Sequence, residues 1–222
     1  MESYASSDDD YVYESEEEYS YVKEASLASK EPAILKEHDS RSFAKKAEAA
    51  SRLASYEAKF IGKGTSFGSM CIKRDFRTLA KEPLDGVTVE FVGDSLYKWH
   101  VYMDVAMDLP EFEGDCRRWG VTQIHLEITF PEDYPSSPPF VRVITPRFAM
   151  HTGHVTVGGS ICAEVLTPSG WTAARTMADL IVDLQALIAA GGPRLDPTNQ
   201  SPYSEAEARA NFLRIARSKG WL

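Results

Sequence analysis

The sequence contains no apolar run long enough to cross a membrane. No stretch of about 18 or more apolar residues occurs in its 222 residues. The opening, MESYASSDDD, lacks the positive flank and the apolar centre of a secretion signal. We therefore expect a soluble protein inside the cell, cytoplasmic or nuclear, that does not bind membranes.

Cysteine is also scarce. The chain has Cys71, Cys116 and Cys162, and these form no CxxC pair. An odd number of cysteines without metal-ligand spacing argues against both a disulfide framework and a zinc site. We expect reduced thiols and no bound metal.

Positive charge is in deficit as well. The net charge is −9, and residues 1–24 hold nine acidic side chains against Lys23 alone. This segment carries −8 of the total, so the rest of the chain is nearly neutral. Without a basic stripe to meet phosphates, nucleic-acid binding is disfavoured.

The acidic opening, residues 1–24, is rich in serine and tyrosine and poor in aliphatic residues. Such a segment cannot bury enough apolar area to offset the entropy cost of ordering, so we expect it to be disordered. The simpler interpretation is a solvating tail. The alternative is a docking strip for a basic partner, with tyrosines as aromatic anchors: Tyr4, Tyr11, Tyr13, Tyr19 and Tyr21.

Residues 25–64 are predicted to form a helical extension or linker. Their apolar residues fall on one side of a helix, and Gly62 and Gly64 follow as a break. Most stripes of this kind pack on the neighbouring domain, and partner binding is the less common role. The stripe consists of Phe43, Ala47, Ala50, Leu53 and Phe60.

Residues 65–222 are predicted to form one α+β domain, because the chain is long enough to bury a core of about 150 residues. A first helix contains Ile72, Phe76 and Leu79 and ends near Pro83. Turn-rich segments such as LPEFEGD join the strand-like runs that follow. Short connections predict an antiparallel meander of four strands. The runs span residues 87–92, 99–107, 121–130 and 139–145.

Two capped helices are predicted in the second half of the domain. An irregular loop, residues 146–175, precedes a central helix that begins at Thr176 and stops at Gly191. A last helix begins at Ser204, with Glu207 completing its capping box, and runs to about Ser218.

Cys162 is the candidate nucleophile. It lies in GGSIC, after the proline-studded segment YPSSPP and before the central helix, so its loop is stiffened on both sides. A lone cysteine is ordinarily a buried structural residue, and the flanking motif argues against that alternative. No lysine or arginine lies within ten residues of Cys162, so no strong local activation of the thiol is predicted.

From Ser69 to Leu222 the chain resembles a ubiquitin-conjugating (UBC) domain. The family's proline turn is represented by YPSSPP, its cysteine loop by GGSIC, and its downstream tryptophan by Trp171. The segments SICAEVLTPSGW and ARSKGW are most similar to the divergent Q-type branch. The resemblance implies a UBC-like fold with an N-terminal helix, the four-stranded meander, an active-site loop, the central helix and a C-terminal helix.

The resemblance also implies a carrier enzyme. Cys162 would accept ubiquitin or a ubiquitin-like protein from an activating enzyme as a thioester and pass it to an amine or a hydroxyl. A thiolate suits this chemistry because it both attacks and leaves readily. No bound cofactor is implied, since only the upstream activating enzyme uses ATP. A ubiquitin ligase would be a further partner.

The sequence departs from the family at the His-Pro-Asn triplet. The family's asparagine precedes the cysteine by eight residues, and that position here is His154, within Thr152-Gly153-His154. We hypothesise that His154 replaces the amide as a hydrogen-bond donor or as a proton acceptor. The alternative is that it belongs to a loop turn.

Asp196, in Leu-Asp-Pro, matches the family's acidic gate once one residue is inserted after the cysteine. A carboxylate at that place can orient an attacking amine, although Asp-Pro is also a common turn initiator. Glu164 matches a position that is often acidic in the family. We include Glu164, Ser160 and Trp171 as residues that support the substrate or the loop.

The ligase-binding surface looks altered. Family members that bind RING-type ligases place a large apolar residue after the Tyr-Pro pair and a Ser-Pro-Ala tract after the tryptophan. Ser136 occupies the first position, followed by Pro138, and Ala173 and Ala174 lie in the second. Loss of an apolar anchor removes roughly 1.5–3 kcal/mol of possible burial. Typical RING binding is therefore in doubt.

Three functional interpretations remain at this point. The first is an active conjugating enzyme, which the agreement of nucleophile and flanking motifs favours. The second is a scaffold that binds ubiquitin or a conjugating partner without chemistry. The third is a thiol hydrolase in which Cys162, His154 and Asp196 form a triad.

Overall fold

A computed structural model describes residues 47, 51, 54–60, 64, 66–105 and 107–222. The acidic opening and most of the predicted extension lie outside these residues. One compact unit spans Glu48–Leu222. Its elements in chain order are α3 (Phe67–Lys81), β1 (Val87–Phe91), β2 (Lys98–Asp104), α4 (Pro110–Trp119), β3 (Gln123–Thr129), β4 (Phe140–Thr145), the 3-10 turn η1 (Glu164–Leu166), α5 (Met177–Ala190) and α6 (Glu205–Ser218).

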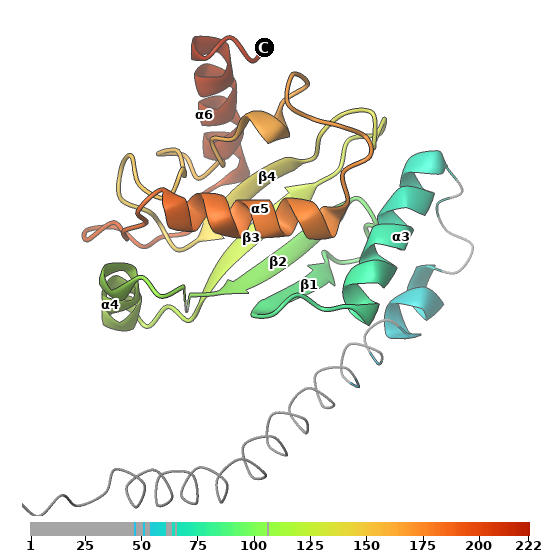
Figure 1. Cartoon of the computed structure of the whole chain (residues 1–222), viewed down its shortest axis with the longest axis horizontal. Helices are drawn as coiled ribbons and strands as arrows, with labels where there is room; N and C mark the ends of the chain where they lie inside the picture. The colour runs from blue at the N-terminus through green and yellow to red at the C-terminus, as the bar shows by residue number, and fades with distance from the viewer. Residues whose placement is uncertain (1–46, 48–50, 52–53, 61–63, 65, 106) are drawn as a thin grey trace, which may run out of the picture. The chain divides into compact units, whose positions relative to one another are not determined.

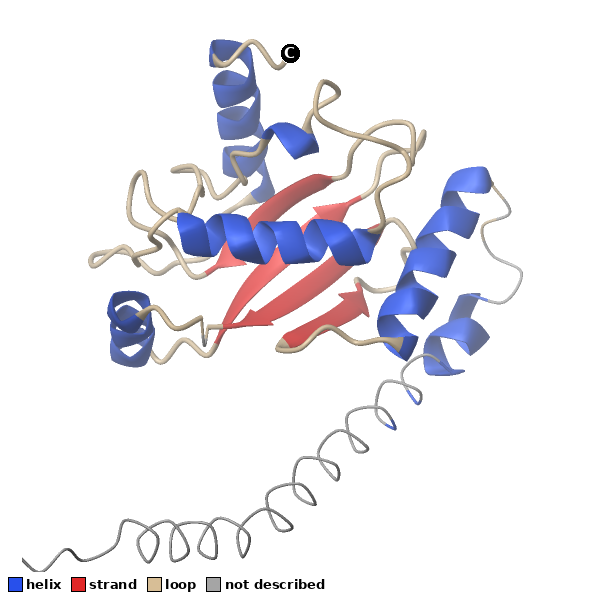
Figure 2. Cartoon of the chain, in the orientation of Figure 1, coloured by secondary structure: helices blue, strands red, loops and turns tan. Residues whose placement is uncertain are grey.

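The predicted α+β architecture and the four-stranded antiparallel meander are confirmed. The strands pair in the order β1-β2-β3-β4, and α5 lies across one face of the sheet (Figures 1 and 2). Inward-facing side chains alternate along β2, as expected for a sheet with one covered face. The core between sheet and helix is fully buried and includes Trp99, Val101, Met103, Ile124, Leu126, Ile128, Leu180, Ile181 and Leu184.

The connection between β2 and β3 was predicted to be a turn, and this is wrong. The segment 109–115 begins helix α4, which the sequence marks with Pro110 in the first turn and left-handed Gly120 at its end. Phe112 and Cys116, one turn apart, are buried. The helix is short and only Phe112 and Cys116 mark an apolar side, so its periodicity was too weak to distinguish it from a loop.

Asp115 connects α4 to the loop after α5. The residue is 6% exposed, and its carboxylate accepts hydrogen bonds from Arg194 Nε at 2.7 Å and from the Leu195 amide at 3.2 Å. The Arg194 guanidinium lowers the pKa of this carboxyl, and the Leu195 amide contributes to the lowering. A buried carboxylate with these donors keeps the chain that follows α5 attached to the end of the sheet.

The first helix is confirmed as α3. Ser66 caps its first turn, and Ile72, Phe76 and Leu79 are buried. Upstream, residues 54–60 are helical, and the ring of Phe60 lies 4.8 Å from that of Phe91. Phe60, the last member of the predicted apolar stripe, is therefore packed in the core, whereas Phe43, Ala50 and Leu53 lie outside the described residues.

The two capped helices are confirmed as α5 and α6. Thr176 accepts a hydrogen bond from the Asp179 amide, and Ser204 and Glu207 form a full capping box. Across the described part of the chain, no helix combines the length and the apolar character needed to span a membrane.

Candidate active site

Cys162 lies at one end of a tight hairpin within the predicted irregular loop. Val155 and Ile161 face each other across an antiparallel bridge, and the Thr156 amide donates to the Ser160 carbonyl at 2.9 Å. The Cys162 amide donates to the carbonyl oxygen of His154 at 2.8 Å. His154 and Cys162, which are eight residues apart in the sequence, therefore lie at the two ends of this hairpin. The hairpin brings them next to each other.

The glycines of GGSIC are required because α6 packs directly on the hairpin. A Cβ on Gly158 would lie 2.4 Å from the Glu207 carbonyl oxygen of α6. Gly159 has a φ of +90°, and a Cβ there would lie 2.5 Å from the Tyr203 ring. Ser160 is fully buried, and its hydroxyl shares a 2.8 Å hydrogen bond with that of Thr156. Ser160 therefore stabilises the hairpin from inside.

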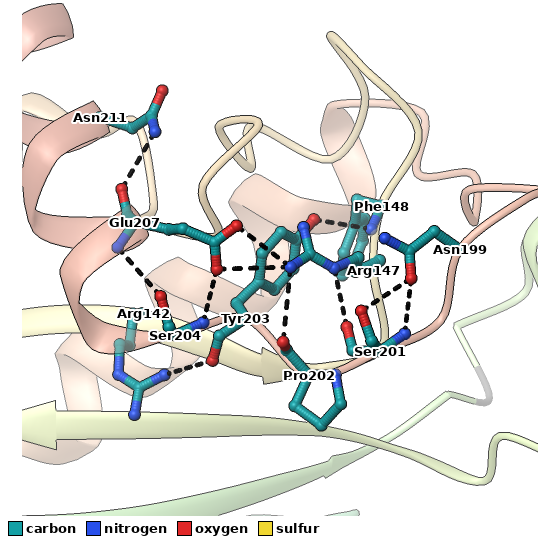
Figure 3. Close-up of polar contacts among 10 residues, drawn as sticks. All are labelled: Arg142, Arg147, Phe148, Asn199, Ser201, Pro202, Tyr203, Ser204, Glu207 and Asn211. Carbon is teal, nitrogen blue, oxygen red and sulfur yellow. Dashed lines mark hydrogen bonds and ion pairs between the residues drawn. The ribbon is translucent and has the colours of Figure 1, made fainter.

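A set of polar contacts fixes the start of α6 (Figure 3). Arg147 Nε donates to the Ser201 carbonyl at 2.7 Å, and the guanidinium lies 4.2 Å from the Tyr203 ring centre. The Tyr203 carbonyl accepts a bond from Arg142 of β4 at 3.0 Å, and its hydroxyl accepts one from the Phe148 amide at 2.9 Å. Since α6 is anchored to the sheet in this way, the position of its far end is also determined.

The thiol opens into a cleft of about 440 Å³ formed by the hairpin, α5 and the end of α6. Cys162 is half-buried, whereas Cys71 and Cys116 are buried. The cleft floor is apolar and its polar lining comes from distant parts of the chain. Its residues are His154, Cys162, Ala163, Glu164, Val165, Asp183, Leu184, Leu187, Lys219 and Trp221.

The Cys162 thiol has two opposing influences on its acidity. Burial raises its pKa, and the ammonium of Lys219 lowers it in part. No lysine or arginine lies within ten residues of Cys162 in the sequence, so the sequence analysis did not anticipate the cation at Lys219. Lys219 comes from the last turn of the chain, and the motif ARSKGW was the signal that could have drawn attention to it.

His154 lies in the cleft on a strained backbone. Its φ is +52°, in the left-handed region, and its side chain is exposed. The end of α5 supports it, since Gly153 N donates to the Gly191 carbonyl at 2.9 Å and a Cβ on Gly191 would lie 2.7 Å from His154 N. The imidazole makes no hydrogen bond to any described residue. The left-handed backbone of His154 fits a role in a loop turn. Its position in the cleft beside the thiol fits a role as hydrogen-bond donor or proton acceptor.

Asp196 does not line the cleft. Its Oδ1 accepts hydrogen bonds from the amide and the hydroxyl of Thr198, each at 2.7 Å, and from the Asn199 amide at 3.1 Å. The Thr198 donors lower the pKa of this carboxyl. These contacts fit the turn-initiator alternative. The carboxylates in the cleft are those of Glu164, which the sequence indicated, and Asp183, which it missed.

Trp171 joins the proline turn to the loop after the cysteine. Its Nε1 donates to the Pro135 carbonyl at 2.8 Å. Ser136, Ala173 and Ala174 are exposed on the two loops that this bond connects. Pro138 instead lines a second, apolar groove of about 390 Å³ with residues of α6. The tryptophan therefore supports the loop, and the four predicted ligase-surface residues do not form one pocket.

Comparison with known proteins identifies the class. The sequence profile of ubiquitin-conjugating enzymes matches residues 71–218. The chain belongs to the ubiquitin-conjugating enzyme family and has its UBC fold.

Several of the most similar relatives carry Q-type names, in agreement with the sequence prediction. The chain is 34% identical over 140 residues to Ubiquitin-conjugating enzyme E2Q-like protein CG4502 of Drosophila melanogaster, covering 61% of this chain and 45% of that protein. It is 32% identical over 142 residues to Ubiquitin-conjugating enzyme E2Q-like protein 1 of Homo sapiens, and the match covers 61% of this chain and 87% of that protein. It is 33% identical over 141 residues to Ubiquitin-conjugating enzyme E2 Q1 of Homo sapiens, and the match covers 60% of this chain and 33% of that protein. The match thus spans less than half of the first and third of these relatives.

Proposed function

We propose that this chain accepts ubiquitin or a ubiquitin-like protein from an activating enzyme as a thioester on Cys162 and transfers it to an acceptor amine or hydroxyl. The observation that supports this most is the half-buried Cys162 thiol, which opens into a cleft while the other two cysteines are buried. An accessible thiol within the region that matches the family is suited to exchange acyl groups between large proteins.

The proposed chemistry has two steps. The Cys162 thiolate attacks the thioester carbonyl of the loaded activating enzyme, so a new S–acyl bond forms while the old one breaks. An acceptor amine or hydroxyl then attacks the same carbonyl, loses its proton, and releases the Cys162 thiolate. Burial raises the pKa of this thiol and leaves less thiolate at neutral pH. A thiolate of higher pKa is also the stronger nucleophile, which offsets part of this loss.

His154, Glu164 and Asp183 are the polar groups proposed to assist transfer. His154 could donate to the developing oxyanion or accept the acceptor's proton, and the Glu164 carboxylate could orient an incoming ammonium. Asp183 would first have to leave its ion pair with Arg175. A gate role for Asp196 would require its carboxylate to leave the bonds to Thr198 and Asn199. That carboxylate is therefore the weaker candidate, and a Cys-His-Asp hydrolase triad is disfavoured for the same reason.

The proposal also includes the setting of the enzyme. Residues 65–222 would be the catalytic domain, residues 25–64 a helical extension and residues 1–24 a solvating tail. The enzyme would work in the cytoplasm or nucleus with ubiquitin or a related modifier, an activating enzyme and a ligase that is not a typical RING binder. The exposed small residues Ser136, Ala173 and Ala174 support that last point, because they provide no large apolar anchor.

A loading assay tests the proposal. The chain is incubated with activating enzyme, ATP and ubiquitin, and the expected product is an adduct that reductant removes and that Cys162→Ala lacks. Cys162→Ser should instead give an oxygen ester that resists reductant. If the parent chain forms no adduct with any modifier, the scaffold interpretation replaces the enzyme. Cleavage of ubiquitin esters without ATP would favour the hydrolase.

A further inference from the structure

An amine lies in the wall of the cleft that contains the candidate nucleophile. Lys219 and Trp221 line the same cavity as Cys162, although they belong to the end of the chain. Burial raises the pKa of the Cys162 thiol, and the positive charge of Lys219 partly lowers it. Figure 1 shows the C-terminus, marked C, on the side of the domain where α6 ends.

The backbone that carries this lysine is held firmly. The Lys219 amide donates to the Ile215 carbonyl at 3.0 Å, and the Trp221 amide donates to that of Ala216 at 2.9 Å. Gly220 takes a φ of +71°, which ends the helix and turns the chain back. Together with the anchored start of α6, these bonds fix where the flexible side chain begins. The Lys219 side chain therefore extends from a fixed backbone position in the wall of the cleft.

The Lys219 side chain is not held by any described carboxylate, unlike Lys59 and Lys98. Within the described residues, its Nζ has no hydrogen bond or ion pair, and the side chain is exposed. By contrast, Lys59 pairs with Asp94 at 2.7 Å, and Lys98 pairs with Glu205 at 3.3 Å. Neither of these lysines lines the cleft.

From this geometry, and resting on the proposed function, we infer that Lys219 is an intramolecular acceptor: the acyl group carried by Cys162 passes to Nζ of Lys219 on the same molecule. The neutral amine attacks the thioester carbon, so a C–N amide bond forms as the C–S bond breaks. The Lys219 ammonium first loses one proton to His154 or Glu164 and from there to water, and after the attack a second proton passes from the nitrogen to the departing sulfur, which restores the Cys162 thiol. No further reagent is needed.

Holding both groups on one rigid scaffold favours this transfer over attack by a free amine. Reactions between groups held close together can proceed as if one reactant were present at very high concentration, up to about 10⁵ M or more in well-oriented cases. Lys219 shares the cleft with the thioester carbon, so it has this advantage over an amine that arrives from solution. The product would be a conjugating enzyme modified in the wall of its own active site, which would hinder further loading.

The experiment follows one loading reaction with two readouts. Loaded enzyme is purified away from activating enzyme and ATP, then sampled over time with and without reductant. We expect the reductant-sensitive thioester to decay into a reductant-resistant adduct at a rate that does not change with enzyme concentration. Peptide mass spectrometry of the unmutated chain should find the modifier's C-terminal remnant on Lys219.

Matched variants complete the test. Lys219→Arg keeps the positive charge and removes the nucleophile, and its ratio of resistant to sensitive adduct should fall at least tenfold. Lys81→Arg, at the exposed end of α3 and outside the cleft, should leave the ratio unchanged. A thioester that forms and never converts, or a resistant adduct mapped to another residue, overturns the inference while leaving the proposed function intact. The absence of any thioester would instead overturn the proposed function itself.

Discussion

At the scale of single residues, the chemistry of this chain depends on how one thiol is surrounded. Cys162 is partly covered by apolar side chains, which disfavours the thiolate, and faces one ammonium, which favours it. The two effects come from different parts of the chain. Burial follows from the hairpin and α5, whereas the charge follows from the end of α6.

We expect the charge of Lys219 to be measurable at the thiol. Lys219→Met should move the pH midpoint of Cys162 alkylation to higher pH, because the remaining influence, burial, raises the pKa. Lys219→Arg should keep the midpoint of the parent chain. Iodoacetamide labelling followed by mass spectrometry reports Cys162 selectively, since Cys71 and Cys116 are buried. Equal midpoints for the Met and Arg variants would show that the ammonium does not act on the thiol.

His154 allows its backbone role to be separated from its chemical role. Because its φ is +52°, His154→Val should lower the free energy of unfolding by about 1–2 kcal/mol in urea titrations. His154→Asn should stay within a few tenths of a kcal/mol, since asparagine tolerates this conformation. If His154 assists transfer, His154→Ala should discharge the thioester more slowly than the parent and His154→Asn variants. Equal discharge by all three would leave only the turn role.

At the scale of elements, α6 matters more to the site than its sequence alone suggests. It covers the glycine hairpin at its start and provides Lys219 and Trp221 to the cleft at its end. Arg142 and Arg147 donate hydrogen bonds to the segment just before α6, which joins that segment to β4 and the chain that follows β4. The nucleophile and the cleft wall therefore depend on the same helix.

Gly159 tests this dependence. Gly159→Ala would place a Cβ 2.5 Å from the Tyr203 ring at a φ of +90°, so we expect a loss of about 3 kcal/mol or more, from overpacking and strain together. Gly93→Ala is the matched control, because its φ is also positive and nothing lies within 4 Å of the added atom. It should lose about 1–2 kcal/mol. Urea unfolding measures the loss of stability in both variants. Equal losses would mean that the Tyr203 ring moves aside without lowering the free energy of unfolding.

The elements also show where sequence reasoning succeeds. α5 and α6 could be predicted because their caps, Thr176 and Ser204, and their apolar periodicity are local signals. α4 was missed because only Phe112 and Cys116 mark its buried side, with Asp115 buried through its bond to Arg194. A short polar helix held by a distant arginine has no local pattern that distinguishes it from a turn.

At the scale of the whole molecule, the open face of the sheet carries a stacked cluster of rings. His125 lies 4.4 Å from Tyr102 and 4.4 Å from His100, and its Nε2 is buried without a partner among the described residues. Burial lowers the pKa of His125 to about 4, and repulsion from His100 and Arg142 contributes to the lowering. The folded protein therefore keeps this imidazole neutral at pH values where the unfolded chain is protonated.

The consequence is a loss of stability in mild acid. With an unfolded pKa of 6.5 and a folded pKa of about 4, the unfolded state binds the extra proton between these values. The stabilising contribution is complete above pH 6.5 and is lost as the pH falls towards 4, by on the order of 2 kcal/mol. His125→Gln should reduce this slope in urea titrations from pH 7 to pH 4.5. A variant with the slope of the parent chain would show that other groups cause it.

Features that depend on neighbours along the chain can be predicted from the order of the residues. The strand alternation, the capped helices, the stiffened loop around Cys162 and its spacing from His154 follow from periodicity, caps and turns that act over a few residues. The charged groups that meet the thiol are instead a product of how distant segments pack. Asp183 and Lys219 enter the cleft and Asp196 does not, because the packing of α5 and α6 on the hairpin, and not distance along the chain, determines which side chains share that space.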